Sequence, residues 1–262
     1  GRKKFEGNIS TTVNVSWGIV GAIEFSIFDE ARQLQILNAY PDLLNSANVI
    51  FGFGDQFNYS LSKGFSAGVS AKLGKGISSK LNFEFEKQES LPELRYQSFF
   101  ASNRAVRPNP QIAEGNDSKI SFNLLAGRSP QDYQPMLQDG VTAQADFSNP
   151  SLGSDFNYRR VRIISQFSTG TIYKELFSSP YFVFGFEGAA VAGNYGPQHL
   201  ITPNTALNIY SPFLTFKGLA PYEYAGDKLL ALHTEHNWRT VPYQAVGFNF
   251  LTDLNIDFIT GF

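Results

Sequence analysis

The 262-residue sequence contains no cysteine. This absence excludes disulfide frameworks, thiol catalysis and cysteine-based zinc sites. The sequence also lacks any run of about 18 apolar residues, the length that a helix needs to cross a bilayer. We therefore do not expect a helical membrane protein. A transmembrane barrel is still possible, because each of its strands needs about 10 alternating residues.

Charge is scarce as well. Charged residues make up 17% of the chain, and the formal net charge is −2. Proteins that bind nucleic acids usually carry a basic patch that neutralises phosphates. The sequence has neither a basic block nor an RNA-binding motif, so we expect no nucleic-acid partner. The chain starts at Gly1 without an apolar leader, and we interpret residues 1–262 as one domain, a fragment of a larger chain.

Aromatic residues, in contrast, are abundant. They make up 15% of the chain, with 25 Phe and 12 Tyr, and they favour strands. The clearest strand signal lies at 245–262, where every second residue is apolar or threonine. The residues between them include Asn249, Asp253 and Asp257. This pattern predicts one long strand with that polar set inward, and with outward side chains from Phe248, Phe250, Ile256 and Phe258.

Shorter alternating stretches predict further strands, roughly a dozen in all. They lie at 8–19, 48–60, 64–73, 81–86, 95–101, 120–124, 140–147, 161–167, 182–186 and 228–239. Turn-rich stretches separate them at 104–118, 129–140, 148–154 and 194–226. Residues 29–40, which precede Pro41, predict a short helix capped by Asp29. The predicted fold class is all-β, an antiparallel transmembrane β-barrel of which roughly 10–12 strands are present.

Several aromatic residues fall near the ends of the predicted strands. Aromatic side chains at such positions form girdles at the two membrane interfaces of a barrel. Ordinary strand composition would explain them equally well. The candidates are Trp17, Tyr59, Tyr158, Tyr181 and Trp238.

The sequence contains three histidines, and two of them, His233 and His236, flank Glu235. On a strand these two histidines point to opposite faces, which disfavours a metal site, whereas a helix would bring them to one side. Glu235, Asp253 and Asp257 carry carboxylates, but no nucleophile or substrate motif accompanies them. We expect these carboxylates to be solvated or paired with lysine and arginine. We therefore expect no catalytic residue, no metal and no cofactor.

A basic cluster is formed by Arg159, Arg160 and Arg162. Arg160 and Arg162 share one face of a predicted strand, and we expect that face to line a lumen. Two arginines there would form part of an anion-selective ring. The alternative is a polar wall in which acids on neighbouring strands balance them.

Four segments carry a resemblance to a known family. They read LLNSANVIFGFGDQFNYSL at 43–61, KGFSAGVSAKLG at 63–74, FEKQESLPELRYQSFFASNRAVRPNP at 85–110 and FVFGFEGAAVAG at 182–193. Together they resemble a family of Gram-negative outer-membrane proteins of unknown function, whose barrel follows a carboxypeptidase-regulatory-like domain. The resemblance implies a barrel in the bacterial outer membrane, with the lipid bilayer as its partner.

A fifth segment, FKGLAPYEYAGDKLLALHTEHNWRTVPY at 216–243, resembles the lumen loop and following strand of BamA-like (surface antigen) barrels. That superfamily inserts and translocates proteins, and the Arg-Gly-aromatic tip of its loop pairs with acidic residues of the barrel wall. The matching positions here are Lys217, Gly218 and Leu219, so the arginine and the aromatic residue are both replaced. The resemblance implies that residues 194–226 fold back toward the lumen. It also implies that the ammonium of Lys217 pairs there with a carboxylate, from Glu235 or Asp253.

Three functions follow from these patterns. The first is a non-enzymatic outer-membrane barrel of the assembly or translocation type, with substrate polypeptides and periplasmic domains of the same chain as partners. The second is a passive channel for small solutes, resembling a porin. The third is a soluble β-sandwich or lipocalin-like binding protein, in which the apolar face packs against another sheet.

Overall fold

A computed structural model describes residues 7–34, 42–51, 55, 57–91, 109–127, 139–171, 179–206, 215–217, 219, 222–254 and 256–261. Its strands are β1 (Gly7–Trp17), β2 (Val20–Gln33), β3 (Tyr59–Gly74), β4 (Ile77–Ser90), β5 (Gly115–Gly127), β6 (Gly140–Ser148), β7 (Asn157–Gly170), β8 (Tyr181–Asn194), β9 (Thr205–Ala206), β10 (Phe216–Lys217), β11 (Lys228–Asn237) and β12 (Ile259–Gly261). Its helices are α1 (Asp42–Phe51), α2 (Val241–Ala245) and α3 (Asn249–Asp253), and its 3-10 turns are η1 (Pro150–Leu152) and η2 (Pro197–His199). Within the described residues, no helix is long and apolar enough to cross a membrane.

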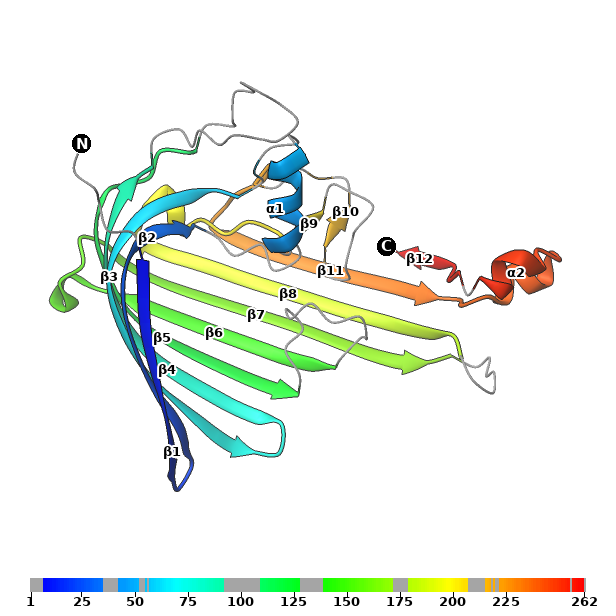
Figure 1. Ribbon diagram of the computed structural model, residues 1–262, viewed down its shortest axis with the longest axis horizontal. Helices are drawn as coiled ribbons and strands as arrows, with labels where there is room; N and C mark the ends of the chain where they lie inside the picture. Colours follow the sequence, from blue (N-terminus) through cyan, green and yellow to red (C-terminus); the bar gives the residue numbers. More distant parts are fainter. Residues whose placement is uncertain are drawn as a thin grey trace.

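Ten of the strands form one sheet in the order β1-β2-β3-β4-β5-β6-β7-β8-β11-β12. All ladders between these neighbours are antiparallel. The sheet is strongly curved (Figure 1), but among the described strands it is not closed, because no ladder joins β1 to β12. The prediction of an all-β, antiparallel fold is confirmed, and the sheet is open.

Two connections are tight hairpins of two residues, at 18–19 and 75–76. Gly18 and Gly76 have φ angles of 61° and 72° there. Such turns need positive φ, which glycine adopts without steric cost. Because the strands alternate in direction, these hairpins lie at one end of the sheet. The connections that contain α1, η1 and η2 lie at the other end.

The two faces of the sheet differ in chemistry, as the alternation along each strand predicts. On one face Phe65 and Leu81 are 38% and 54% exposed. On the other face Glu84 and Glu86 are 9% and 4% exposed. We call the glutamate side, which borders the cavity described below, the concave face, and the opposite side the outer face. This arrangement is the reverse of a soluble domain, where large apolar side chains are usually inside and carboxylates outside.

The prediction of one long strand at 245–262 is wrong. In the structure α2 ends at Ala245, α3 occupies residues 249–253, and β12 joins β11 through three residue pairs, ending at Asn237↔Ile259. This register leaves the residues before Ile259 beyond the end of β11, where no neighbouring strand offers a ladder. Pro242 lacks an N–H for a ladder, and Gly247 turns the chain with a φ of 79°. Alternation alone does not supply a partner strand.

The predicted helix at 29–40 is also wrong over its described part, because residues 29–33 continue β2. Ile23, Phe25 and Ile27 alternate with small and polar residues. The ladder to β1 reaches Asp29, and the ladder to β3 extends the strand to Gln33. The helix instead begins at Asp42, so the strand predicted at 48–60 is wrong before Tyr59. Its apolar residues recur at helical spacing, at Leu43, Leu44, Ala47, Ile50 and Phe51. The strand predicted at 95–101 lies outside the described residues.

The girdle candidates divide between the two faces. Tyr158 is 1% exposed and lies on the concave face, so the girdle prediction is wrong for it. Tyr181 also points inward, where its hydroxyl accepts a hydrogen bond from Asn237 at 3.2 Å. Trp238 continues the outer-face positions of β11 and is 38% exposed.

Candidate functional site

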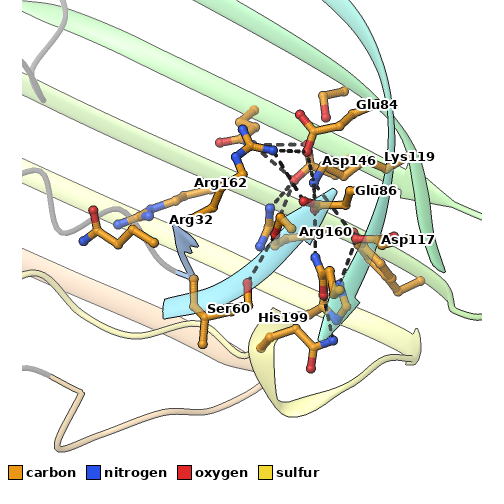
Figure 2. Close-up of a pocket in the computed structure, with 18 of the residues that line it drawn as sticks. Arg32, Ser60, Glu84, Glu86, Asp117, Lys119, Asp146, Arg160, Arg162 and His199 are labelled. Carbon is orange, nitrogen blue, oxygen red and sulfur yellow. Dashed lines mark hydrogen bonds and ion pairs between the residues drawn. The ribbon is translucent and has the colours of Figure 1, made fainter. Parts of the chain in front are cut away.

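The concave face carries a set of buried ion pairs (Figure 2) that we call the concave network. Its acidic members are Glu84, Glu86, Asp117, Asp146 and Glu187. Its basic members are Arg32, Lys119, Arg160 and Arg162. The alternation of each strand turns all of these side chains to the same face, and the ladder register then sets which of them meet.

Lys119 of β5 is the centre of this network. Its Nζ lies 2.9 Å from Glu84 Oε1 and 3.2 Å from Glu86 Oε1, both on β4. Arg32 of β2 reaches the same two carboxylates, with its Nη1 at 3.3 Å and 3.4 Å. The register places Glu84 directly opposite Lys119 and Glu86 opposite Asp117. A buried charge that loses its partner is costly, so removing one member should destabilise the others.

Arg160 and Arg162 lie on this face as predicted, and each has an acidic partner on a neighbouring strand. Arg160 Nη2 lies 2.7 Å from Asp146 Oδ2 on β6. The Nε of Arg162 donates to Glu187 Oε1 on β8 at 2.9 Å. Asp146 also accepts hydrogen bonds from Gln144. The geometry favours the balanced polar wall over the anion-selective ring, because both guanidinium groups are neutralised locally.

A second cluster surrounds Asp117, whose side chain is fully buried. The hydroxyl of Tyr158 donates to Asp117 Oδ2 at 3.1 Å, and Ser148 Oγ donates to Oδ1 at 3.1 Å. His199 Nε2 lies 3.1 Å from the same Oδ2. His199 belongs to η2, in the connection between β8 and β11, and its ring lies 4.3 Å from that of Tyr158. Asp117 therefore ties this connection to the sheet.

The neighbouring residue Gln198 adds two hydrogen bonds between this connection and other segments of the chain. Its Nε2 lies 3.0 Å from Gln88 Oε1 and 2.9 Å from the carbonyl oxygen of Ala113. Ile201, a few residues further on, joins a small apolar cluster with Phe156 and Val191. The prediction that residues 194–226 fold back against the inner face therefore holds for residues 196–205, which the structure describes continuously.

The predicted tip of this loop lies mostly outside the described residues. Lys217 is described through its backbone, in β10 beside Ala206 of β9, but its side chain is outside the described part. Gly218 is also outside it, whereas Leu219 is described and half-buried. Glu235 lies on the concave side of β11, at the same alternation as Ala231. Pairing of Lys217 with Glu235 thus stays a prediction.

The predicted place of Asp253 on the inner face of a strand is wrong, and its pairing with Lys217 stays a prediction. Asp253 ends α3, where its side chain is exposed, because residues 249–253 form a helix instead of a strand. Asp257 is paired, with its Oδ2 2.8 Å from Arg239 Nη1. This pair agrees with the expectation that the carboxylates of this segment meet basic groups.

The two histidines of β11 point to opposite faces, as the strand reading predicts. The ring of His233 lies 4.9 Å from that of Phe216. On the outer face the ring of His236 lies 4.0 Å from Phe182 and 3.7 Å from Trp238. In the described part of the chain, no three histidine, aspartate or glutamate side chains form a group that could hold a metal ion.

A polar cavity of about 860 Å³ opens on the concave face. Strands β2 to β8 and residues 198–202 line it. Of the residues that line the cavity, Arg160 and Arg162 are predicted from the sequence to face inward. The sequence gives no such prediction for Arg32, Asp117, Lys119 and His199. Alternation marks such residues as inward-facing, whereas their partners depend on register and are not visible in the sequence.

Comparison with known proteins adds no relative. No protein-family model matches the chain, and no curated protein matches it. Two features of the sheet bear on function: an exposed apolar outer face, and a concave face with paired charges and an inward-folded connection.

Proposed function

We propose that this chain is the wall of a non-enzymatic β-barrel in the outer membrane of a Gram-negative bacterium, of the assembly or translocation type. The proposal rests on the distribution of side chains between the two faces of the sheet, which is the reverse of that in a soluble domain. The outer face exposes large apolar side chains on every long strand, and the concave face buries charged ones. In a membrane barrel the outer face contacts lipid and the inner face contacts water or a plug.

The exposed apolar surface is continuous across the strands. Its members include Ile23, Phe25, Ile27, Phe65, Val69, Leu81, Phe122, Phe147, Val161, Ile163, Phe167, Phe184, Leu230 and Leu232. Leu230 and Leu232 are 74% and 69% exposed. Fully burying one such side chain is worth roughly 1.5–3 kcal/mol, so a contiguous surface of this kind strongly favours a lipid environment.

This apolar band has a sharp margin at the end of the sheet that carries α1 and η1. Asp29, Lys63, Lys87 and Asn116 face outward on four adjacent strands, and the ladders place each opposite the next. On β3 the band runs from Phe65 to Leu73, eight residue steps or roughly 26 Å along a strand. At a tilt of about 40° it would span about 20 Å, of the same order as the apolar band of about 25 Å in outer-membrane barrels. Charged residues at such a margin meet the lipid headgroups.

The assembly or translocation type rests on the sequence resemblance of residues 216–243 to the BamA-like lumen loop and strand. The connection between β8 and β11 supports it, because residues 198 and 199 contact the concave face. The third interpretation, a soluble sandwich, is not favoured. Ten of the described strands form one large sheet, and the two-stranded sheet of β9 and β10 lies on its concave side, where Phe216 contacts His233.

Tryptophan fluorescence tests the membrane proposal directly. The chain contains two tryptophans, so the Trp17→Phe variant leaves Trp238 as the single probe. After refolding into vesicles, its emission should shift to the blue, and lipids brominated near the headgroup should quench it more than lipids brominated near the chain end. A red emission that brominated lipids leave unchanged would contradict the proposal.

A passive channel is the second candidate, favoured by the polar cavity of about 860 Å³. Planar-bilayer recordings of the reconstituted chain separate the two candidates. Steady, single-size conductance steps would favour the channel. A sealed bilayer would favour the assembly or translocation type.

A further inference from the structure

Three of the primary amides that line the cavity lie on neighbouring strands: Asn82 on β4, Asn123 on β5 and Gln144 on β6. Asn123 lies directly opposite Gln144, and Asn82 lies opposite Ser121, two residues before Asn123. Among the described residues, the side-chain amides of Asn82 and Asn123 have no hydrogen-bond partner. Each of these two amides offers two donors and one acceptor to whatever occupies the cavity.

The backbone makes room for this arrangement. Gly68 of β3 lies opposite Asn82, and a Cβ at Gly68 would come within 2.8 Å of Asn82 Oδ1. The asparagine side chain thus lies in space that glycine leaves open. Gln144 donates through Nε2 to both oxygens of Asp146 at 3.1 Å, and its own carbonyl oxygen is left as a further acceptor.

The charged residues around these amides are balanced. The described lining contains five acidic residues, Glu30, Glu84, Glu86, Asp117 and Asp146. It also contains five basic residues, Arg32, Lys80, Lys119, Arg160 and Arg162. All of the basic residues are within ion-pair distance of a carboxylate. An ionic solute would have to compete with these pairs, whereas a neutral solute would leave them intact.

Most of the residues that line the cavity are polar or charged, which favours a ligand that can form hydrogen bonds. Its volume of about 860 Å³ falls within the roughly 300–1,000 Å³ typical of small-molecule sites. A ligand that displaces water from such a surface must replace the hydrogen bonds that water makes. Vicinal hydroxyl groups meet this requirement, because each can donate to an amide oxygen and accept from an amide nitrogen.

We propose that the concave cavity is a binding site for a neutral, polyhydroxylated solute, an oligosaccharide, held by the amides of Asn82, Asn123 and Gln144. This inference goes beyond the proposed function, because it concerns the chemistry of the solute and does not depend on where the chain resides. Asp146 of the concave network holds the amide of Gln144, and the ion pairs of the network exclude charged competitors.

The test is calorimetric titration of the detergent-solubilised full chain with two neutral trisaccharides, maltotriose and cellotriose. At least one should bind with a dissociation constant in the millimolar range or below. Gluconate and glucosamine, which carry one negative and one positive charge, should bind at least tenfold more weakly. The double variant Asn82→Leu/Asn123→Leu, similar in shape but without the amides, should weaken trisaccharide binding at least tenfold.

Asn116→Leu is the matched control, because Asn116 lies on the same strand as Asn123 but on the outer face. It should leave the binding constant unchanged, and circular dichroism should show the same strand content in all variants. The proposal is overturned if neither trisaccharide binds, if a charged solute binds more tightly, or if Asn116→Leu weakens binding as much as the double variant. Since the titration needs no bilayer, its failure is distinct from a failure of the tryptophan test.

Discussion

His199 Nε2 and Asp117 Oδ2 lie 3.1 Å apart, although the two residues are separated by 82 positions in the chain. This contact joins the connection after β8 to the start of β5. Tyr158 and Ser148 direct their hydroxyl groups at the same carboxylate. Asp117 therefore holds together three segments that meet through tertiary packing.

Replacing Asp117 should weaken the contact between the β8–β11 connection and the sheet. Asp117→Ala leaves the buried Tyr158 hydroxyl and the His199 ring without their acceptor, whereas Ser148 keeps the carbonyl oxygen of Ser118 at 2.8 Å. We expect the free energy of unfolding to fall by about 2–4 kcal/mol. His199→Ala should cost less, because Tyr158 and Ser148 keep their partner. Urea unfolding measures both changes. Limited proteolysis should cut the connection between β8 and β11 faster in both variants. An unchanged cutting rate would show that the contact between His199 and Asp117 does not hold this connection against the sheet.

Lys119 should be the most sensitive member of the concave network. Lys119→Met leaves Glu84 and Glu86 close together with Arg32 as their remaining cation, and we expect a loss of about 3–5 kcal/mol in unfolding free energy. Adding Glu86→Gln should restore part of it in a double-mutant cycle. Lys87→Met is the control, because this exposed lysine pairs with Glu89 on the outer face and should leave stability unchanged. Equal losses for both lysines would refute the assignment.

Two adjacent residues of β5 test the chemistry of the faces. Phe122 points outward and is 44% exposed, whereas Asn123 lines the cavity. In lipid vesicles Phe122→Arg should destabilise the protein by about 2–4 kcal/mol, because it places a charge in the apolar band. Asn123→Arg places the same charge toward the polar cavity and should cost about 1 kcal/mol or less. Stability in vesicles is read from urea titration, and a larger loss for Asn123→Arg would reverse the assignment of the faces.

Gly64 of β3 should not tolerate a side chain. A Cβ at this position would lie 1.9 Å from the carbonyl oxygen of Phe85 on β4. Gly64→Ala should therefore push the two strands apart and lower the unfolding free energy by about 2–3 kcal/mol. At Gly74, on the same strand, a Cβ would meet no atom within 4 Å. Gly74→Ala should be neutral or stabilise by about 0.4–1 kcal/mol, and thermal unfolding of the two variants decides between these outcomes.

Local patterns were reliable wherever a strand had partners on both sides. The alternation around Phe83, Phe122 and Ile163 correctly assigned each residue to a face, because side chains of a strand alternate whatever its neighbours are. The same alternation at 245–262 failed, since the chain there lies beyond the end of β11 and no ladder stabilises an extended backbone. The helix predicted from Asp29 failed for the opposite reason: the ladder to β3 continues through that segment as far as Gln33.

The sequence by itself determined that the fold is all-β and that apolar and charged side chains lie on opposite faces, because a two-residue period acts within a single strand. Only the tertiary structure decided which charges meet. Lys119 reaches Glu84 across 35 residues because the β4–β5 register places them opposite each other. His199 reaches Asp117 because the connection after β8 folds back onto the sheet. Such contacts depend on strand order, register and loop packing, which arise from the cooperation of distant segments and leave no periodic signal in the chain.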